Sequence, residues 1–262
     1  MNHCDYVKCI IKGMELYFRT FALAENMSYQ SGDIEWIMPL SNATGPSVVF
    51  RVVPDEKTVI NQIDKLIPGL NTGAVPSVWV ISPTSTPENI IDCLLSKGFK
   101  NLSNPEKPEL GMALDIEMIP LISAINPELK VKKVNSPSEF KLWINVVNEA
   151  LIGWSMLSIE HYHTWISCDG LSFYLAYCDG TPIATVLTIQ DGDAASVEFV
   201  STLKEYRNQG AATTVCMEAL RELRNKGVKT VTLRSSNKAI PLYTKLGFKP
   251  YYEQILMSYQ NN

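Results

Sequence analysis

The hydrophobic positions of the chain follow two different periodicities, and these predict its secondary structure. Stretches such as 47–53 and 194–202 have the nearly continuous valine, isoleucine and phenylalanine content of buried strands. In segments such as 55–68, apolar residues recur at three- and four-residue spacing and mark one face of a helix. Because strands and helices alternate along the chain, the pattern predicts an α/β fold.

The expected elements divide into two groups around a proline-bracketed segment, Pro120 to Pro127. In the first group we expect helices at 3–12, 13–27, 55–68 and 87–97 and strands at 34–38, 47–53, 77–81 and 111–117. In the second we expect strands at 130–134, 172–177, 182–190, 194–202 and 229–234, helices at 136–151 and 154–166, one from Ala211 and one from Ala239 to the stop at Gly247, and a last strand. The predicted domains are residues 1–122 and 128–262.

Composition supports two ordinary globular domains and excludes several classes of function. The chain has 262 residues, of which 46% are hydrophobic and 19% charged, enough for two separate cores. Its net charge of −4 argues against a nucleic-acid partner, because phosphate backbones need a basic surface. With no run of 18 apolar residues and no secretory signal pattern, we expect a cytoplasmic protein, monomeric or homodimeric, without a membrane partner.

Cysteines and histidines show no spacing that suits a metal ion. The six cysteines, at positions 4, 9, 93, 168, 178 and 216, include no CxxC pair, so reduced and mostly buried thiols are expected. His161 and His163 are two residues apart, which on a helix turns them in different directions. The sequence therefore predicts no metal site.

A short polar segment, residues 206–212, joins a predicted strand to a predicted helix and reads Tyr-Arg-Asn-Gln-Gly-Ala-Ala. The first N–H groups of a helix have no internal partners and carry the positive end of its dipole, so an anion can bind there. Gly210 would let a phosphate approach the backbone. Residues 203–234 hold seven Lys or Arg and three Asp or Glu, which suits a polyanion. The alternatives are an ordinary turn and the solvated face of a helix.

The residues that follow this turn in the sequence help to interpret its function. After the helix comes a strand, residues 229–234, and then Leu242-Tyr243-Thr-Lys-Leu-Gly247-Phe248. Together these segments resemble the acetyl-CoA-binding half of the GNAT acetyltransferases, whose signature is an Arg/Gln-x-x-Gly-x-Gly/Ala turn followed by Leu-Tyr-x-x-x-Gly-Phe. The resemblance covers residues 130–255. It implies that acetyl-CoA is bound by Phe199, Val200, Ser201, Thr202, Arg207, Asn208, Gln209, Gly210, Ala211, Ala212, Thr213 and Ser236. Ser236 stands where the family commonly has an asparagine, which puts the usual hydrogen bond there in doubt.

Two residues are candidates for proton transfer. In the family a tyrosine at the position of Tyr243 has its hydroxyl near the thioester sulfur, and a phenol is protonated at pH 7 and can donate to a thiolate. Glu198 is on the strand before the turn, where family members often carry a glutamate, and is the candidate base. The alternatives are a tyrosine packed in the core and a solvated or ion-paired glutamate.

The first half of the chain repeats the layout of the second. Residues 78–100 and 231–249 both consist of a strand, a serine-containing turn, a helix and Gly-Phe-Lys. Leu94 stands at the position of Tyr243, and Asp55 and Glu56 stand where a phosphate would bind, so this copy would repel an anion. We therefore expect two GNAT-like domains, each with a mixed, mostly antiparallel sheet flanked by helices, of which the N-terminal one is degenerate.

The implied function is the transfer of an acetyl group from acetyl-CoA to a primary amine of a small molecule or a protein, by direct attack in a ternary complex. Two alternatives remain open at this stage: a non-catalytic sensor that binds acyl-CoA, and a transferase that uses another acyl group.

Overall fold

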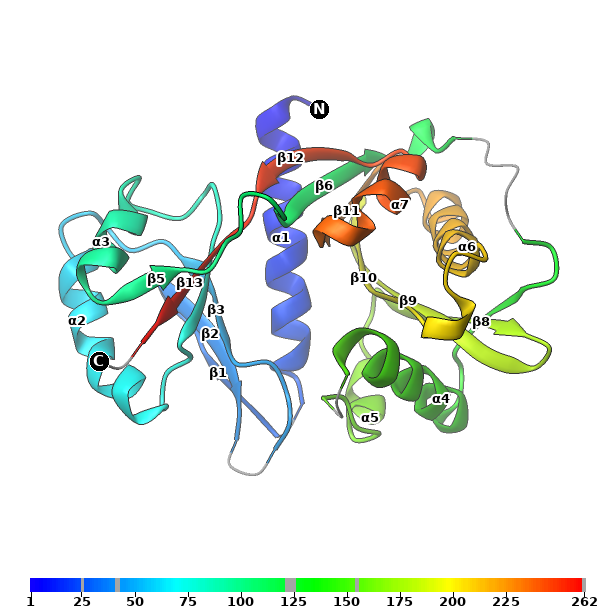
Figure 1. The fold of residues 1–262 in the computed structure, drawn as a ribbon, viewed down its shortest axis with the longest axis horizontal. Helices are drawn as coiled ribbons and strands as arrows, with labels where there is room; N and C mark the ends of the chain where they lie inside the picture. The colour runs from blue at the N-terminus through cyan, green and yellow to red at the C-terminus, as the bar shows by residue number, and fades with distance from the viewer. Residues whose placement is uncertain (25, 41–42, 121–125, 154–155, 261–262) are drawn as a thin grey trace. The chain divides into compact units, whose positions relative to one another are not determined.

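The structure is a computed structural model that describes residues 1–24, 26–40, 43–120, 126–153 and 156–260. It divides into two compact units, Met1–Gly111 with Tyr251–Asn262, and Met112–Pro250. Each unit has one mixed, mostly antiparallel sheet with helices packed on it (Figure 1). The predicted α/β class is thus confirmed.

The sheet of the first unit has six strands in the order β1-β2-β3-β4-β13-β5. One pair, β3 with β4, is parallel and the other pairs are antiparallel. The strands are β1 (Met27–Gln30), β2 (Ile34–Pro39), β3 (Val48–Val52), β4 (Val78–Ile81), β13 (Ile255–Tyr259) and β5 (Phe99–Asn101).

Helices cover both faces of this sheet. Helix α1 (His3–Phe21) stacks Phe18 on Phe50 of β3, with ring centroids 5.2 Å apart. Helices α2 (Val59–Thr72) and α3 (Ile90–Ser96) pack against a cluster around Trp79. Burial of alternate sides of β3 and β4 against different helices fixes their register.

Three helix predictions in this unit differ from the structure. The two helices predicted at 3–12 and 13–27 are replaced by one helix, α1, which ends at Phe21, because the buried stripe continues through Gly13 from Ile10 and Ile11 to Met14 and outweighs the low helix propensity of glycine. The predicted helix 55–68 begins later, at Val59, and runs through Pro68 to Thr72. It ends at Gly73, whose φ of 76° is the left-handed conformation that closes a helix.

The sheet of the second unit has seven strands in the order β12-β6-β11-β10-β9-β8-β7. Residues 183–189 of β9 are buried without a break, as expected for a strand covered on both faces. Helices α4 (Pro137–Val147) and α6 (Ala211–Asn225) provide this cover (Figure 1). The strands are β12 (Lys249–Glu253), β6 (Leu110–Asp115), β11 (Thr230–Ser235), β10 (Ala194–Thr202), β9 (Thr181–Asp191), β8 (Leu171–Cys178) and β7 (Lys130–Lys133).

The last strand of each half of the chain belongs to the sheet of the other half. Strand β6 follows β5 in sequence but lies between β12 and β11 in the second sheet. Strand β13 follows β12 but lies between β4 and β5 in the first. The sequence predicted one last strand within a domain 128–262; the structure has two, separated at Gln254 and placed in different sheets. The predicted domain boundary near Pro120 falls partly on residues 121–125, outside the described residues, and the two predicted ranges remain a prediction.

The helical region predicted at 154–166 is shorter in the structure. Helix α5 covers only His161–Ile166, and Trp154 lies outside the described residues. The side chain of Asn148 holds Leu157 in a non-helical conformation by bonding both its N–H and its C=O, at 3.0 and 2.9 Å. Trp143 and Trp165 are fully buried, so they are core residues.

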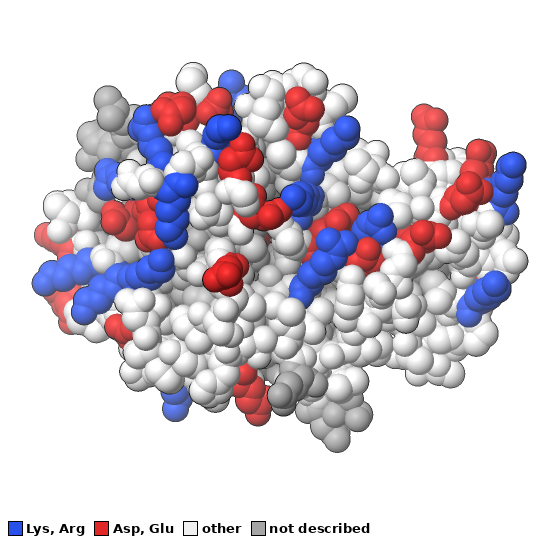
Figure 2. All heavy atoms as spheres, turned by 180° about the vertical axis from the view of Figure 1, so that it is seen from behind, with Lys and Arg blue, Asp and Glu red and all other residues white. Residues whose placement is uncertain are grey.

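The surface carries charges of both signs. On the face shown in Figure 2, lysine and arginine side chains are interspersed with aspartate and glutamate. All six cysteines are free thiols and only Cys216 is buried, so the expectation of mostly buried thiols was wrong. Among the described residues no helix is long and apolar enough to cross a membrane.

Candidate active site

The two parallel strands at the centre of the second unit separate partway along their length. β10 and β11 pair from Ala194↔Thr230 to Ser196↔Thr232, and beyond that point β10 continues to Thr202 with only β9 as its partner. Beyond Ser196 the edge of β10 that faces β11 is therefore not paired with β11, and an extended chain could bond to it there. The opening lies along Phe199 to Thr202, which the resemblance implies are among the residues that bind acetyl-CoA.

A bulge on β10 sets the direction of this free edge. Its register with β9 shifts between Glu198 and Ser201, and Phe199 has a φ of 50°, which is unusual for a bulky residue. Thr185 of β9 supports the bulge: its fully buried hydroxyl lies 2.8 Å from the carbonyl oxygen of Phe199 and bonds the hydroxyl of Ser201. A carbonyl only accepts, so Thr185 donates to Phe199 and accepts from Ser201.

We expect Thr185→Val to weaken binding of the cosubstrate as well as stability. The substitution removes the buried hydroxyl that bonds the Phe199 carbonyl and the Ser201 hydroxyl, at a cost of about 1–3 kcal/mol in unfolding free energy. Thermal unfolding and the KM for acetyl-CoA measure the two effects. Thr232→Val is the matched control. The buried hydroxyl of Thr232 donates a hydrogen bond of 3.3 Å to the Ala195 carbonyl, which is not part of the bulge. An equal rise of KM in both variants would show that the bulge has no special role.

Helix α6 begins where β10 and its following turn end. Its N-cap is Gly210, with a φ of 83°, and no side chain caps the helix, so the first N–H groups have no intrahelical acceptor. The side chain of Arg207 stabilises the preceding loop through two hydrogen bonds. Its Nε donates to the carbonyl of Thr202 at 3.0 Å, and its Nη2 donates to the carbonyl of Ala150 at 2.9 Å. Arg207 thus shapes the turn through the backbone while it lines the cavity described next.

A cavity of about 560 Å³ connects the strand opening to the start of α6. Its charged lining residues are Arg207, Lys238 and Lys245, and no acidic residue of the described chain lines it. An anion is therefore favoured electrostatically. The lining consists of Ala150, Leu151, Val200, Ser201, Thr202, Tyr206, Arg207, Asn208, Gly210, Ala211, Ala212, Thr213, Ser236, Lys238, Ala239, Leu242, Tyr243 and Lys245.

Tyr243, on α7 (Ile240–Lys245), lines this cavity with only 6% of its surface exposed. Its ring packs against Phe248, with centroids 5.9 Å apart, so it is a core residue as well as a cavity residue. Burial raises the pKa of Tyr243 well above its usual range, and Cys216 and Glu198 raise it further. The phenol therefore stays protonated at neutral pH and can act only as a donor to an anion.

Glu198 is buried on β10 and pairs with Arg234 of β11. The distance from Glu198 Oε2 to Arg234 Nη2 is 3.3 Å. Burial raises the pKa of Glu198, and the Arg234 guanidinium acts in the opposite direction. The carboxyl does not line the cavity itself, but it is close enough to Tyr243 to affect the pKa of the phenol.

Most of the residues expected at the cofactor site lie together on this cavity. Of them, Phe199 and Gln209 lie outside its lining, as does the candidate base Glu198. The ring of Phe199 packs against Trp143, with ring centroids 5.4 Å apart, and the side-chain amide of Gln209 donates to the carbonyl of Glu205. Sequence reasoning missed Thr185 beneath the bulge and the lining residues Leu151, Tyr206, Lys238 and Lys245. Tyr206 and Lys245 could have been found, since they are inside the turn 206–212 and the Leu-Tyr-x-x-x-Gly-Phe motif. Tertiary packing alone places Thr185, Leu151 and Lys238.

The first unit has the same order of elements around its parallel strands but different chemistry. At the end of β3 and the start of α2, a cavity of about 540 Å³ is lined by Asp33, Asp55, Glu56 and Glu88. Four carboxylates here contrast with three cations in the second unit, which agrees with the expectation that this copy repels anions. Leu94, at the position of Tyr243, is fully buried.

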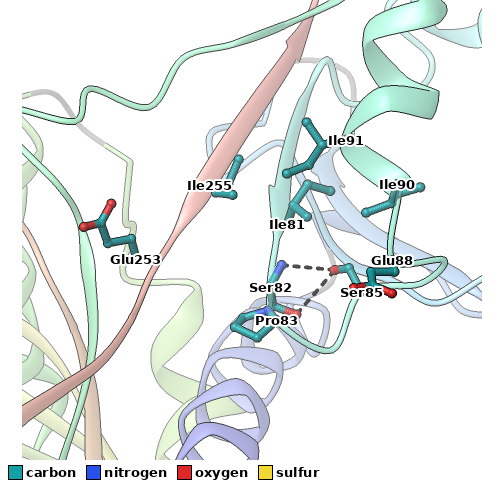
Figure 3. Close-up of a pocket in the computed structure, with 9 residues that line it drawn as sticks. All are labelled: Ile81, Ser82, Pro83, Ser85, Glu88, Ile90, Ile91, Glu253 and Ile255. Atoms are coloured by element: carbon teal, nitrogen blue, oxygen red, sulfur yellow. Dashed lines mark hydrogen bonds between the residues drawn. The ribbon is translucent and has the colours of Figure 1, made fainter.

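A second cavity of the first unit, about 220 Å³, lies against β4, α3 and β13 (Figure 3). Its wall is made by Ile81, Ile90, Ile91 and Ile255. In the turn after β4, Ser85 Oγ accepts a hydrogen bond of 3.0 Å from the backbone N–H of Ser82. Among the described residues, no group of three or more His, Cys, Asp or Glu is arranged to hold a metal ion.

A parallel strand pair that opens towards a helix start without a side-chain cap, beside a cationic cavity, is an arrangement that suits an anionic ligand. Residues 140–248 match the model of the acetyltransferase (GNAT) family. No curated protein sequence matches the chain.

Solved structures match over both units. A GCN5-related N-acetyltransferase from Kribbella flavida is 15% identical, with a TM-score of 0.68, and the match covers 95% of this chain and 96% of that one. A tandem GNAT protein from the clavulanic acid biosynthesis pathway is 12% identical, with a TM-score of 0.60 over 98% and 94% of the two chains. A putative GNAT acetyltransferase from Novosphingobium aromaticivorans is 16% identical, with a TM-score of 0.55 over 94% and 95%. At these identities the matches show a shared fold, and they confirm the predicted tandem arrangement.

Proposed function

We propose that the second unit is an N-acetyltransferase that moves an acetyl group from acetyl-CoA to a primary amine of a small molecule or a protein, by direct attack in a ternary complex. The observation that carries this proposal is the cavity: it joins a free strand edge, an uncapped helix start and three cationic side chains, with a buried tyrosine in its wall. GNAT family membership of residues 140–248 supports acyl transfer.

The residues present fit acetyl-CoA. The backbone of Val200 to Thr202 would pair with the amide groups of the pantetheine arm. The first turn of α6, from Ala211 to Thr213, would bind the pyrophosphate through N–H groups. Lys238 and Lys245 would contribute positive charge, whereas Arg207 would mainly keep the turn in shape, because two of its donors bond carbonyls. Ser236 lines the cavity and offers a short hydroxyl in place of the family's asparagine.

The cosubstrate supplies an acetyl thioester, and the chain supplies the proton transfers. Glu198 would accept the proton that the amine loses as its nitrogen bonds the acetyl carbon, directly or through one water. Tyr243 would donate its phenolic proton to the sulfur as the carbon–sulfur bond breaks. Solvent would then restore both groups. Neither side chain forms a covalent bond to the acetyl group.

The direct test is an assay of the full-length protein with acetyl-CoA and a panel of amines, read as release of free thiol. Thiol release that depends on the amine is the expected result. Binding of acetyl-CoA without such release would favour the acyl-CoA sensor, and release only with a longer or charged acyl thioester would favour a different acyl group.

We expect Gly210→Ala to weaken acetyl-CoA binding beyond its effect on folding. At a φ of 83° a Cβ costs about 1 kcal/mol of unfolding free energy, and here it also moves the first N–H groups of α6. Gly227→Ala is the matched control, since Gly227 follows the other end of α6 at a φ of 80° with nothing near its Cβ position. Calorimetric titration with coenzyme A compares them; similar affinities in the two variants would contradict the phosphate role.

A further inference from the structure

The ion pair between Glu198 and Arg234 occupies a particular place in the sheet. The last backbone pair between β10 and β11 is Ser196↔Thr232, and side chains two residues further along each strand point to the same face. In that register the next opposed residues are Glu198 and Arg234. Their side chains meet at 3.3 Å across the point where the backbone hydrogen bonds stop.

Both side chains are largely removed from solvent. The side-chain exposure is 9% for Glu198 and 17% for Arg234. A buried carboxylate without a cation beside it would take up a proton and lose its ability to act as a base. The Arg234 guanidinium therefore opposes the effect of burial on the pKa of Glu198, and the ion pair fixes the carboxyl beside the point where the two strands separate.

Few other groups can take over this function. Tyr243 from α7 faces Glu198 and is neutral, and Cys216 from α6, whose pKa burial raises to about 12, faces Tyr243 and is a neutral thiol. The partner of Glu198 on β9 is the apolar Leu187, and on its own strand the neighbour on the same face is Ser196. Arg234 is thus the one described cation that faces the carboxyl.

We propose that Arg234 is a positioning residue for catalysis: it spans the point where β10 and β11 separate, and keeps the carboxylate of Glu198 ionised and in a fixed position beside that point. This inference rests on the proposed function, in which Glu198 is the base. It assigns to Arg234 no contact with the cosubstrate.

The test compares the pH dependence of kcat/KM for the wild type, Arg234→Met and Arg234→Lys. We expect Arg234→Met to lower kcat/KM at neutral pH by roughly tenfold or more. Part of the lost kcat/KM should return at higher pH, because without Arg234 the carboxyl of Glu198 loses its proton only at a higher pH. Arg234→Lys should restore most of the activity and of the pH profile. The KM for acetyl-CoA should stay close to that of the wild type.

A double-mutant cycle separates this effect from simple loss of structure. If Arg234 acts through Glu198, Arg234→Met in a Glu198→Gln background lowers kcat no further. Arg224→Met is the matched control, because it removes an exposed arginine–glutamate pair with Glu117 in the same unit. Thermal unfolding and coenzyme A binding show whether each variant is folded; if Arg234→Met does not fold, the lysine variant and its pH profile decide.

The outcomes are distinct. A wild-type protein that releases no thiol with any amine overturns the proposed function. An active wild type whose Arg234→Met variant keeps the wild-type pH profile, or whose two substitutions add in full, overturns the assignment of Arg234 and leaves the acetyltransferase proposal standing.

Discussion

Replacing Tyr243 with phenylalanine is expected to lower kcat by about a hundredfold or more and to leave the affinity for acetyl-CoA nearly unchanged. A decrease in kcat of this size is typical when a general acid is removed. Affinity is kept because the ring, which packs on Phe248, is retained, and among the described residues no hydrogen bond to the hydroxyl is lost.

Single-turnover kinetics and titration with coenzyme A measure the two quantities separately. Tyr177→Phe is a suitable control, since this half-buried tyrosine on β8 lies outside the cavity lining. An unchanged kcat in Tyr243→Phe would remove the acid role and leave Tyr243 as a core residue alone.

The second large effect concerns the exchanged strands. A fragment of residues 128–262 lacks β6, which lies between β12 and β11 in the second sheet, and it ends in β13, whose partners β4 and β5 are absent. We expect it to aggregate or remain unfolded, because it exposes unpaired strand edges and an incomplete core.

A fragment of residues 108–254 contains all seven strands of the second sheet and is the matched comparison. We expect it to unfold cooperatively and to bind coenzyme A, with circular dichroism and calorimetry as the readouts. A stable, cofactor-binding fragment 128–262 would show that β6 is dispensable to the sheet.

Local signals made much of the site predictable. Gly210 has a φ of 83°, a conformation that favours glycine, and the apolar run of β10 locates it at the start of α6. Tyr243 follows from its spacing to Gly247. These features depend on neighbours within a few residues, so periodicity and turn chemistry are enough to find them.

Other parts of the site depend on contacts between residues distant in sequence. Thr185 looks like any threonine of a buried strand, yet the bulge of β10 depends on its hydroxyl. Arg234 looks like a polar residue at a strand end, and only the register of β10 with β11 brings it opposite Glu198. Nothing local marks such pairs, because strand pairing is set by the whole sheet.

The sequence by itself determined that the chain has two α/β halves of the same layout and that only the second has the glycine-containing turn and the tyrosine of the motif. Those properties are encoded in apolar periodicity, in Gly210 and in the carboxylates Asp55 and Glu56. The tertiary structure decided which strands complete which sheet, since β6 and β13 have apolar patterns that suit either one. It also decided where β10 and β11 separate, because the bulge and the Glu198–Arg234 pair at that point exist only when distant strands are packed side by side.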